Sequence, residues 1–213
     1  MPTDQPVTGL LLAAGQGSRM GTPKAVLEVG SRTLTEMAVE ALLDGGCGDV
    51  LVVLGADAQR VRTRLEANAA TWGERVDTGE CANWSGGMSE SLRTGLAMLA
   101  ARGKRCPQAT LIHLVDLPDV GAEVVSRILE HGRASGRLAD ALVRAAYQGF
   151  AGHPTLLGQS HWQGVMDSAT GDRGAGPYLR LHEAAAVACD DLAYGRDVDT
   201  PAELTAYLDQ RKG

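Results

Sequence analysis

The sequence is poor in aromatic residues, which make up 4% of its 213 residues and include one phenylalanine. A core of this composition must be built from Ala, Leu and Val, and the hydrophobic content of 44% supplies them. Long apolar runs are also missing, because the run over residues 7–14 is too short to cross a bilayer. The polar residues 1–6 are unlike a signal peptide. We therefore expect a cytoplasmic protein with no membrane partner.

Cysteines are few and runs of basic residues are absent. The four cysteines are scattered without a CxxC pair, which predicts idle thiols in a reducing compartment rather than a disulfide set or a zinc site. The net charge is −6, and no stretch gathers Lys and Arg. This charge argues against nucleic acid as a partner. An acidic protein can still bind a polyphosphate where local cations and a metal neutralise it.

Apolar runs alternate with helical patterns along the chain. Runs typical of strands buried on both faces lie at 7–14, 49–55 and 109–115, with a weaker strand at 75–78. Helical periodicity covers 33–44, 57–70, 86–101 and 123–131. A hairpin-like pair over 139–157, a helix end at 179–182, a strand at 184–189 and a helix capped by Thr200 and Glu203 follow. The alternation predicts an α/β fold, a Rossmann-like three-layer α/β/α sandwich with a mostly parallel mixed sheet.

A glycine-rich loop follows the first apolar run, at the sheet edge where ligands of such folds bind. Gly15, Gly17 and Gly21 let backbone N–H groups approach an anion, and Arg19 and Lys24 can pair with phosphate oxygens. The spacing GxGxxxG departs from the dinucleotide fingerprint GxGxxG, and the Walker sequence is also missing. The loop predicts a phosphate cradle, with an ordinary turn bearing incidental charges as the structural alternative.

The segment LAAGQGSRMGTPK, which ends at Lys24, resembles the signature of nucleotidyltransferases with a glycosyltransferase-A-like fold. Within that group it is most similar to the molybdenum cofactor cytidylyltransferases and their guanylyltransferase relatives. In such proteins the backbone of the first four residues faces the base, the Arg contacts the outer phosphates and the Lys reaches the α-phosphate. The resemblance implies nucleotide-binding residues here at Leu12, Ala13, Ala14, Gly15, Gly17, Ser18, Arg19 and Lys24.

Two acidic motifs resemble the metal-binding motifs of the same family. Asp116 ends an apolar run, where a carboxylate suits Mg²⁺ or simply caps the turn, and it matches the family's Asp-x-Pro. Leu117 stands where the cytidylyltransferases usually carry Gln. Asp199 matches the family's closing Asp-x-Asp-Thr-Pro as a second metal ligand, unless it only complements a helix N-terminus. We expect Lys24, Arg19 and Asp116 to be catalytic, with Mg²⁺ as cofactor.

Three further segments resemble family motifs. Asn83, Gly87 and Ser91 belong to a stretch at a predicted helix start, where they are expected to bind the nucleotide. The sequences GFAGHP at 149–154 and GDRGAG at 171–176 resemble motifs on the acceptor side. The expected acceptor-binding residues are His153, Asp172 and Arg173, although a lone His is more often structural.

The resemblance covers about residues 8–205 and implies the activity. We expect one domain over 1–213, with the nucleotide bound by about 7–120 and the acceptor by about 121–213. The leading hypothesis is transfer of CMP from CTP to the terminal phosphate of molybdenum–molybdopterin, with release of pyrophosphate and possible delivery to a molybdenum hydroxylase. Alternatives are guanylyl transfer from GTP to the same cofactor, nucleotidyl transfer to a sugar phosphate, a non-catalytic cofactor chaperone, and a dinucleotide-binding oxidoreductase, which the loop spacing disfavours.

Overall fold

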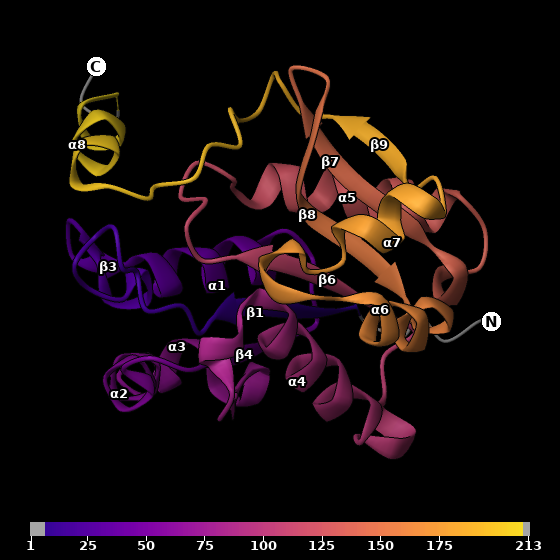
Figure 1. The fold of residues 1–213 in the computed structure, drawn as a ribbon, viewed down its shortest axis with the longest axis horizontal. Helices are drawn as coiled ribbons and strands as arrows, with labels where there is room; N and C mark the ends of the chain where they lie inside the picture. Colours follow the sequence, from indigo (N-terminus) through magenta and orange to yellow (C-terminus); the bar gives the residue numbers. More distant parts are fainter. Residues whose placement is uncertain (1–6, 211–213) are drawn as a thin grey trace.

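A seven-stranded sheet forms the centre of the computed structural model, which describes residues 7–210 (Figure 1). The strands are β1 (Thr8–Ala13), β4 (Asp49–Leu54), β5 (Val76–Glu80), β6 (Ala109–Leu114), β7 (Leu142–Tyr147), β8 (Phe150–Gly158) and β9 (Ala185–Ala188). Their order across the sheet is β5-β4-β1-β6-β8-β7-β9. Only β8 is antiparallel to its neighbours β6 and β7. The predicted mostly parallel mixed sheet is confirmed.

Helices cover both faces of this sheet and complete the predicted three layers. One face packs against α1 (Leu34–Asp44) and α5 (Ala122–Ala134), and the other against α4 (Met88–Ala100), α6 (Trp162–Ser168) and α7 (Gly176–Leu181). Successive strand residues serve opposite faces. Leu11 packs on the side of α1 and α5, whereas Leu10 and Leu12 pack on the side of α4. This is why the buried strands read as continuous apolar runs.

Several local elements differ from the pattern predicted from the sequence. The helix expected at 57–70 is divided into α2 (Ala58–Glu66) and α3 (Ala69–Trp72). At the break, the Asn68 side chain donates hydrogen bonds to the Arg64 carbonyl and to Glu36, which competes with continued helix. The helix expected from residue 86 begins at Met88, because Gly87 has a φ of +103°. The short strands β2 (Glu28–Val29) and β3 (Arg32–Thr33) and helix α6 were not predicted.

The C-terminal helix α8 (Pro201–Gln210) lies at the periphery, at the end of a long segment that leaves β9 (Figure 1). Its predicted capping box is present: Glu203 Oε2 accepts from the Thr200 N–H at 2.8 Å, and Thr200 Oγ1 accepts from the Glu203 N–H at 3.3 Å. The four cysteines are unpaired, as expected. Among the described residues, none of the helices is long and apolar enough to cross a membrane. Residues 1–6, judged above to be unlike a signal peptide, lie outside the described residues.

Candidate functional site

The carboxyl ends of β1, β4 and β6 meet at one edge of the sheet, because these strands are parallel and in register. The loops that follow them surround a cavity of about 550 Å³. Most residues predicted to bind nucleotide or metal line it: Leu12, Ala14, Gly15, Gly17, Ser18, Arg19, Lys24, Gly87, Ser91, Asp116 and Asp199. The cavity therefore gathers residues from almost the whole length of the chain.

Two of the predicted nucleotide-binding residues lie outside this lining. Ala13 is buried within β1, and Asn83 is exposed beyond the rim. Conversely, the walls include Gln16, Trp84, Ser85 and Asp197, which sequence reasoning did not select. Each of these four lies inside a segment that the resemblance covers, so the motifs located the wall but not every residue that faces the cavity.

A lysine between two carboxylates forms the polar centre of the cavity. Lys24 Nζ lies 2.7 Å from Asp116 Oδ2 and also contacts Asp199 Oδ1, while Arg19 Nη2 lies 2.8 Å from Asp199 Oδ2. The Lys24 side chain is only 14% exposed, so solvent screens these contacts weakly. The backbone adds a further tie, because the Val198 N–H donates to the Asp116 carbonyl at 2.9 Å. This hydrogen bond holds the acidic segment at residues 197–199 against the end of β6.

The electrostatics of this centre keep lysine and carboxylate charged. Burial alone would lower the pKa of Lys24, but the charges and hydrogen bonds of Asp116 and Asp199 outweigh it and raise that pKa above its usual value. The hydrogen bond from Lys24 lowers the pKa of Asp199. Burial, together with the like charges of Asp116 and Asp199, raises the pKa of Asp197 to about 6. The carboxylates outnumber the cations at this edge, which favours a bound metal ion.

The donor set fits a magnesium ion shared with a polyphosphate. Asp116 Oδ1 is buried and has no hydrogen-bond partner among the described residues, so one carboxylate oxygen is open to a cation. Within residues 7–210, no group of three or more His, Cys, Asp or Glu side chains has the arrangement of a metal site. Mg²⁺ commonly uses one or two carboxylates and completes its shell with water and substrate phosphates. Asp116 and Asp199 match that pattern.

The glycine loop can adopt its path only because particular positions lack a side chain. Gly17 has a φ of +64°, and its carbonyl accepts hydrogen bonds from the Met20 and Gly21 N–H groups. A Cβ at Gly17 would lie 2.1 Å from the Thr22 carbonyl oxygen. A Cβ at Gly55, after β4, would lie 2.5 Å from the Ala14 carbonyl oxygen. Close backbone approach therefore shapes both sides of the loop.

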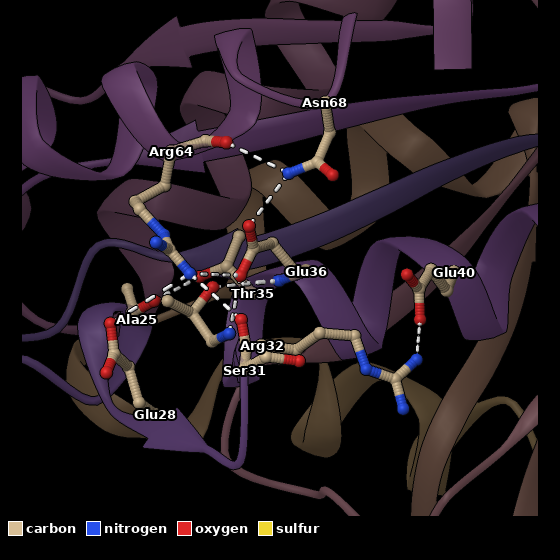
Figure 2. Close-up of polar contacts among 10 residues, drawn as sticks. Ala25, Glu28, Ser31, Arg32, Thr35, Glu36, Glu40, Arg64 and Asn68 are labelled. Atoms are coloured by element: carbon tan, nitrogen blue, oxygen red, sulfur yellow. Dashed lines mark hydrogen bonds and ion pairs between the residues drawn. The ribbon is translucent and has the colours of Figure 1, made fainter. Parts of the chain in front are cut away.

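A buried polar cluster fixes the backbone behind Lys24 (Figure 2). Thr35 Oγ1, in the first turn of α1, donates to the carbonyl of Ala25 at 2.7 Å. Glu36 accepts hydrogen bonds from the Thr33 N–H and from Arg64 and Asn68 of the neighbouring helical segment. Thr33 and Glu36 also form a capping box for α1.

The Glu36 carboxylate stays charged within this cluster. Burial would raise its pKa, but the hydrogen bonds from Thr33, Arg64 and Asn68 outweigh burial and lower it. A charged Glu36 therefore fastens the start of α1 to the end of α2, behind the segment that carries Lys24.

A smaller cavity of about 170 Å³ adjoins the first and shares Leu12, Met88 and Asp172 with it. The predicted acceptor residues His153, Asp172 and Arg173 all line it. Asp172 Oδ1 accepts from the Met88 N–H at 3.2 Å, which holds this loop against the start of α4.

The His153 ring is half-buried and neutral. Its Nδ1 lies 3.4 Å from the Ile112 carbonyl, and burial lowers its pKa. A neutral imidazole here can donate or accept a hydrogen bond without adding charge to the smaller cavity.

A third cavity of about 590 Å³ lies between α1 and the segments around residues 115–122 and 190–194. Two of its acidic residues have partners, because Asp119 Oδ2 accepts from the Tyr194 and Gly195 N–H groups and Asp191 pairs with Arg127, whereas Asp119 Oδ1 is buried without a hydrogen-bond partner among the described residues. None of the residues predicted to bind nucleotide, metal or acceptor lines this third cavity.

Comparisons with known proteins agree with this geometry. Residues 9–187 match the family described as MobA-like NTP transferase domain. Nicotine blue oxidoreductase of Paenarthrobacter nicotinovorans is 38% identical over 217 residues, which cover 97% of this chain and 98% of that protein. The crystal structure of Rv0371c from Mycobacterium tuberculosis shares the fold, with a TM-score of 0.77, 23% identity and coverage of 97% of this chain and 100% of that one.

A second structure of Rv0371c, in complex with manganese, has a TM-score of 0.71 at 25% identity and covers 96% of this chain and 98% of that one. Both likenesses extend over the whole sheet and its helices, and they confirm the fold predicted from the alternating pattern.

Proposed function

The chain belongs to the family of MobA-like NTP transferase domains, and on that premise we propose that it transfers CMP from CTP to the terminal phosphate of molybdenum–molybdopterin. Membership makes it a nucleotidyltransferase, as its glycine loop and acidic motifs predicted. One observation carries the finer proposal: the contacts of Lys24 with Asp116 and Asp199, at the floor of a cavity large enough for a nucleotide.

The proposed nucleotidyl transfer requires charge neutralisation and positioning of the substrates rather than a general base. The attacking oxygen of a phosphate monoester is already anionic, so no proton must be removed before it attacks. Lys24 would neutralise the α-phosphate, and Arg19, which is far more exposed at the mouth, would neutralise the departing pyrophosphate. Both cations are held in the apo site by carboxylates, which the incoming phosphates would replace as partners.

We propose Mg²⁺ as the cofactor, with Asp116 and Asp199 as its protein ligands. When bound, the ion would neutralise charge on the triphosphate and help to orient it. The unpartnered Asp116 Oδ1 supports this assignment. The manganese complex of Rv0371c is a further support, because a divalent ion binds a protein of the same fold.

The acceptor assignment is supported by the second cavity. His153, Asp172 and Arg173 line a space that shares Leu12 and Met88 with the nucleotide cavity. An acceptor bound there would present its phosphate to the nucleotide. The product would be a dinucleotide form of the cofactor, used by a molybdenum hydroxylase in the cytoplasm.

The test is pyrophosphate release with each of four NTPs and with molybdopterin or sugar phosphates as acceptors. CTP with molybdopterin should be the best pair, and titration calorimetry with Mg²⁺ should show tighter binding of CTP than of GTP. Preference for GTP would favour the guanylyltransferase alternative, and turnover with a sugar phosphate alone would replace the acceptor. Co-purified pterin without any pyrophosphate release would favour a chaperone.

Asp116→Asn tests the metal role within that assay. It removes a charge at nearly constant shape, so we expect pyrophosphate release to fall on the order of 100-fold or more, as when one stabilising group of a transition state is lost. Asp191→Asn is the matched control, because Asp191 pairs with Arg127 outside the nucleotide cavity. Retained activity in Asp116→Asn would remove Asp116 from the mechanism.

A second candidate function is an oxidoreductase, favoured by the 38% identity to nicotine blue oxidoreductase. It predicts oxidation of NADH or NADPH in the presence of nicotine blue and without any NTP. The loop spacing GxGxxxG is not that of a dinucleotide fingerprint. Lys24→Met separates the two functions, because loss of the lysine should abolish nucleotidyl transfer and need not affect dye reduction.

A further inference from the structure

Arg144 is a half-buried arginine whose charge has no partner in the described part of the chain. It lies in β7, opposite Thr155 of β8, and it lines the smaller cavity. Its Nε is buried without a hydrogen-bond partner, and no carboxylate within residues 7–210 forms an ion pair with it. Other arginines of comparable burial, such as Arg102 and Arg93, are paired with carboxylates.

An unpaired guanidinium in the wall of the smaller cavity is suited to bind an anionic ligand. Arginine keeps its charge and offers five N–H donors in a planar fork. Buried polar groups in native proteins nearly always have partners, so an unpartnered one in a cavity wall is consistent with a ligand that binds there. The fork suits a phosphate, which can accept two parallel hydrogen bonds from it.

Further positive charge gathers around the same cavity. Arg173 also lines it, and the Arg180 Nη1 atom lies 3.5 Å from where a Cβ of Gly176 would stand, on the cavity wall. Burial first, and the charge of Arg180 second, lower the pKa of Arg144. In Figure 1, α7, which carries Arg180, lies across the β7–β8 pair. The one acidic residue of the lining is Asp172, which also accepts from the Met88 N–H.

The smaller cavity adjoins the nucleotide cavity. Leu12, Met88 and Asp172 belong to both linings. His153 also lines the smaller cavity, and the charges of both Asp116 and Arg144 influence its pKa. A small molecule bound at Arg144 would therefore lie next to the nucleotide cavity.

We propose that Arg144 binds the phosphate monoester of the acceptor and holds it beside the α-phosphate of the nucleotide. The assignment rests on the proposed transferase function, since an anion at this place is then the second substrate. It adds to the acceptor-binding residues a cation that no motif indicated. Because Arg144 has no polar partner within the described residues, we expect its replacement by Gln to weaken acceptor binding without lowering the stability of the protein.

The first test is binding of inorganic phosphate, measured by calorimetry with the nucleotide cavity filled by Mg²⁺ and a non-hydrolysable CTP analogue. We expect Arg144→Gln to bind phosphate at least 10-fold more weakly than the wild type. Arg144→Lys should fall between them, because it keeps the charge and loses the fork. Arg127→Gln, which removes an arginine outside both cavities, is the matched control and should bind like the wild type. Equal affinities in wild type and Arg144→Gln would overturn the proposal.

The second test separates a binding role from a structural one. Without phosphate, Arg144→Gln should unfold at the same temperature as the wild type or higher, since it removes an unpaired charge, and phosphate should raise the midpoint of the wild type alone. A lower midpoint for the variant would show a structural role and overturn the proposal.

In the pyrophosphate assay, Arg144→Gln should raise KM for the acceptor at least 10-fold and leave KM for the NTP unchanged. If no acceptor supports pyrophosphate release in the wild type, the proposed function fails, and the phosphate titration still decides the role of Arg144.

Discussion

The buried imidazole of His113 predicts a specific dependence of stability on pH. His113 lies in β6 with none of its surface exposed, and neither ring nitrogen has a hydrogen-bond partner among the described residues. Burial lowers the pKa of His113 to about 3, and repulsion from His153 when that ring is protonated is the smaller cause. An unfolded histidine has a pKa of about 6.5. The folded protein therefore holds this ring neutral where the unfolded chain protonates it.

The sign and the size of the effect follow from proton linkage. Below pH 6.5, His113 binds a proton in the unfolded chain but not in the folded protein, so a lower pH favours unfolding. The contribution of neutral His113 to the free energy of unfolding is fully present above about pH 6.5. As the pH drops from there toward the folded pKa, this contribution falls by up to ~1.4 kcal/mol per pH unit. Between pH 7 and pH 5 the loss due to His113 is about 2 kcal/mol. It depends almost entirely on the unfolded pKa as long as the folded pKa lies well below 5.

The assay compares the wild type with His113→Phe, which replaces the ring with an apolar one of similar size. Free energies of unfolding come from urea denaturation followed by circular dichroism at pH 5, 6 and 7. The difference between the two proteins should shift by about 2 kcal/mol in favour of the variant on going from pH 7 to pH 5. His131→Gln, on the exposed surface of α5, controls for the loss of one histidine from the chain. A difference that is the same at pH 5 and pH 7 would refute the buried neutral ring.

Two further predictions concern the supports of the nucleotide site. Gly17→Ala should prevent nucleotide binding, because its Cβ would meet the Thr22 carbonyl oxygen in addition to the strain of a positive φ. Gly21→Ala has the same backbone strain, at a φ of +76°, but meets nothing within 4 Å and should lose less affinity; calorimetric titration compares the two variants, and equal losses would contradict the steric argument. Glu36→Ala should lower the free energy of unfolding by roughly 1–3 kcal/mol, because it removes half of a capping box and the acceptor of the hydrogen bonds from the Thr33 N–H and the Asn68 side chain. Urea denaturation measures it, and a loss below about 1 kcal/mol would mean that the cluster is no more than a surface ion pair.

Much of the sheet and its layers could be predicted because the determining patterns are local. A strand buried on both faces must be apolar at successive positions, so the runs that became β1, β4 and β6 were visible without any knowledge of their neighbours. The short strands β2 and β3 have two residues each, which is too few to produce an alternation. The break between α2 and α3 depends on Glu36, which lies 32 residues from Asn68 in the sequence.

The phosphate-binding glycine loop could be recognised without a structure, because its three glycines and two cations lie close together in the chain. Their spacing limits which kind of phosphate-binding loop the backbone can form. The sequence by itself also determined the alternation that builds the sheet, and hence the edge at which the loop stands. Only the tertiary structure decided that Lys24 meets Asp116 and Asp199, 92 and 175 residues away, and that Arg144 is left without a partner. Whether a charge is paired depends on every segment that packs around it, and that is a property of the folded chain rather than of any motif.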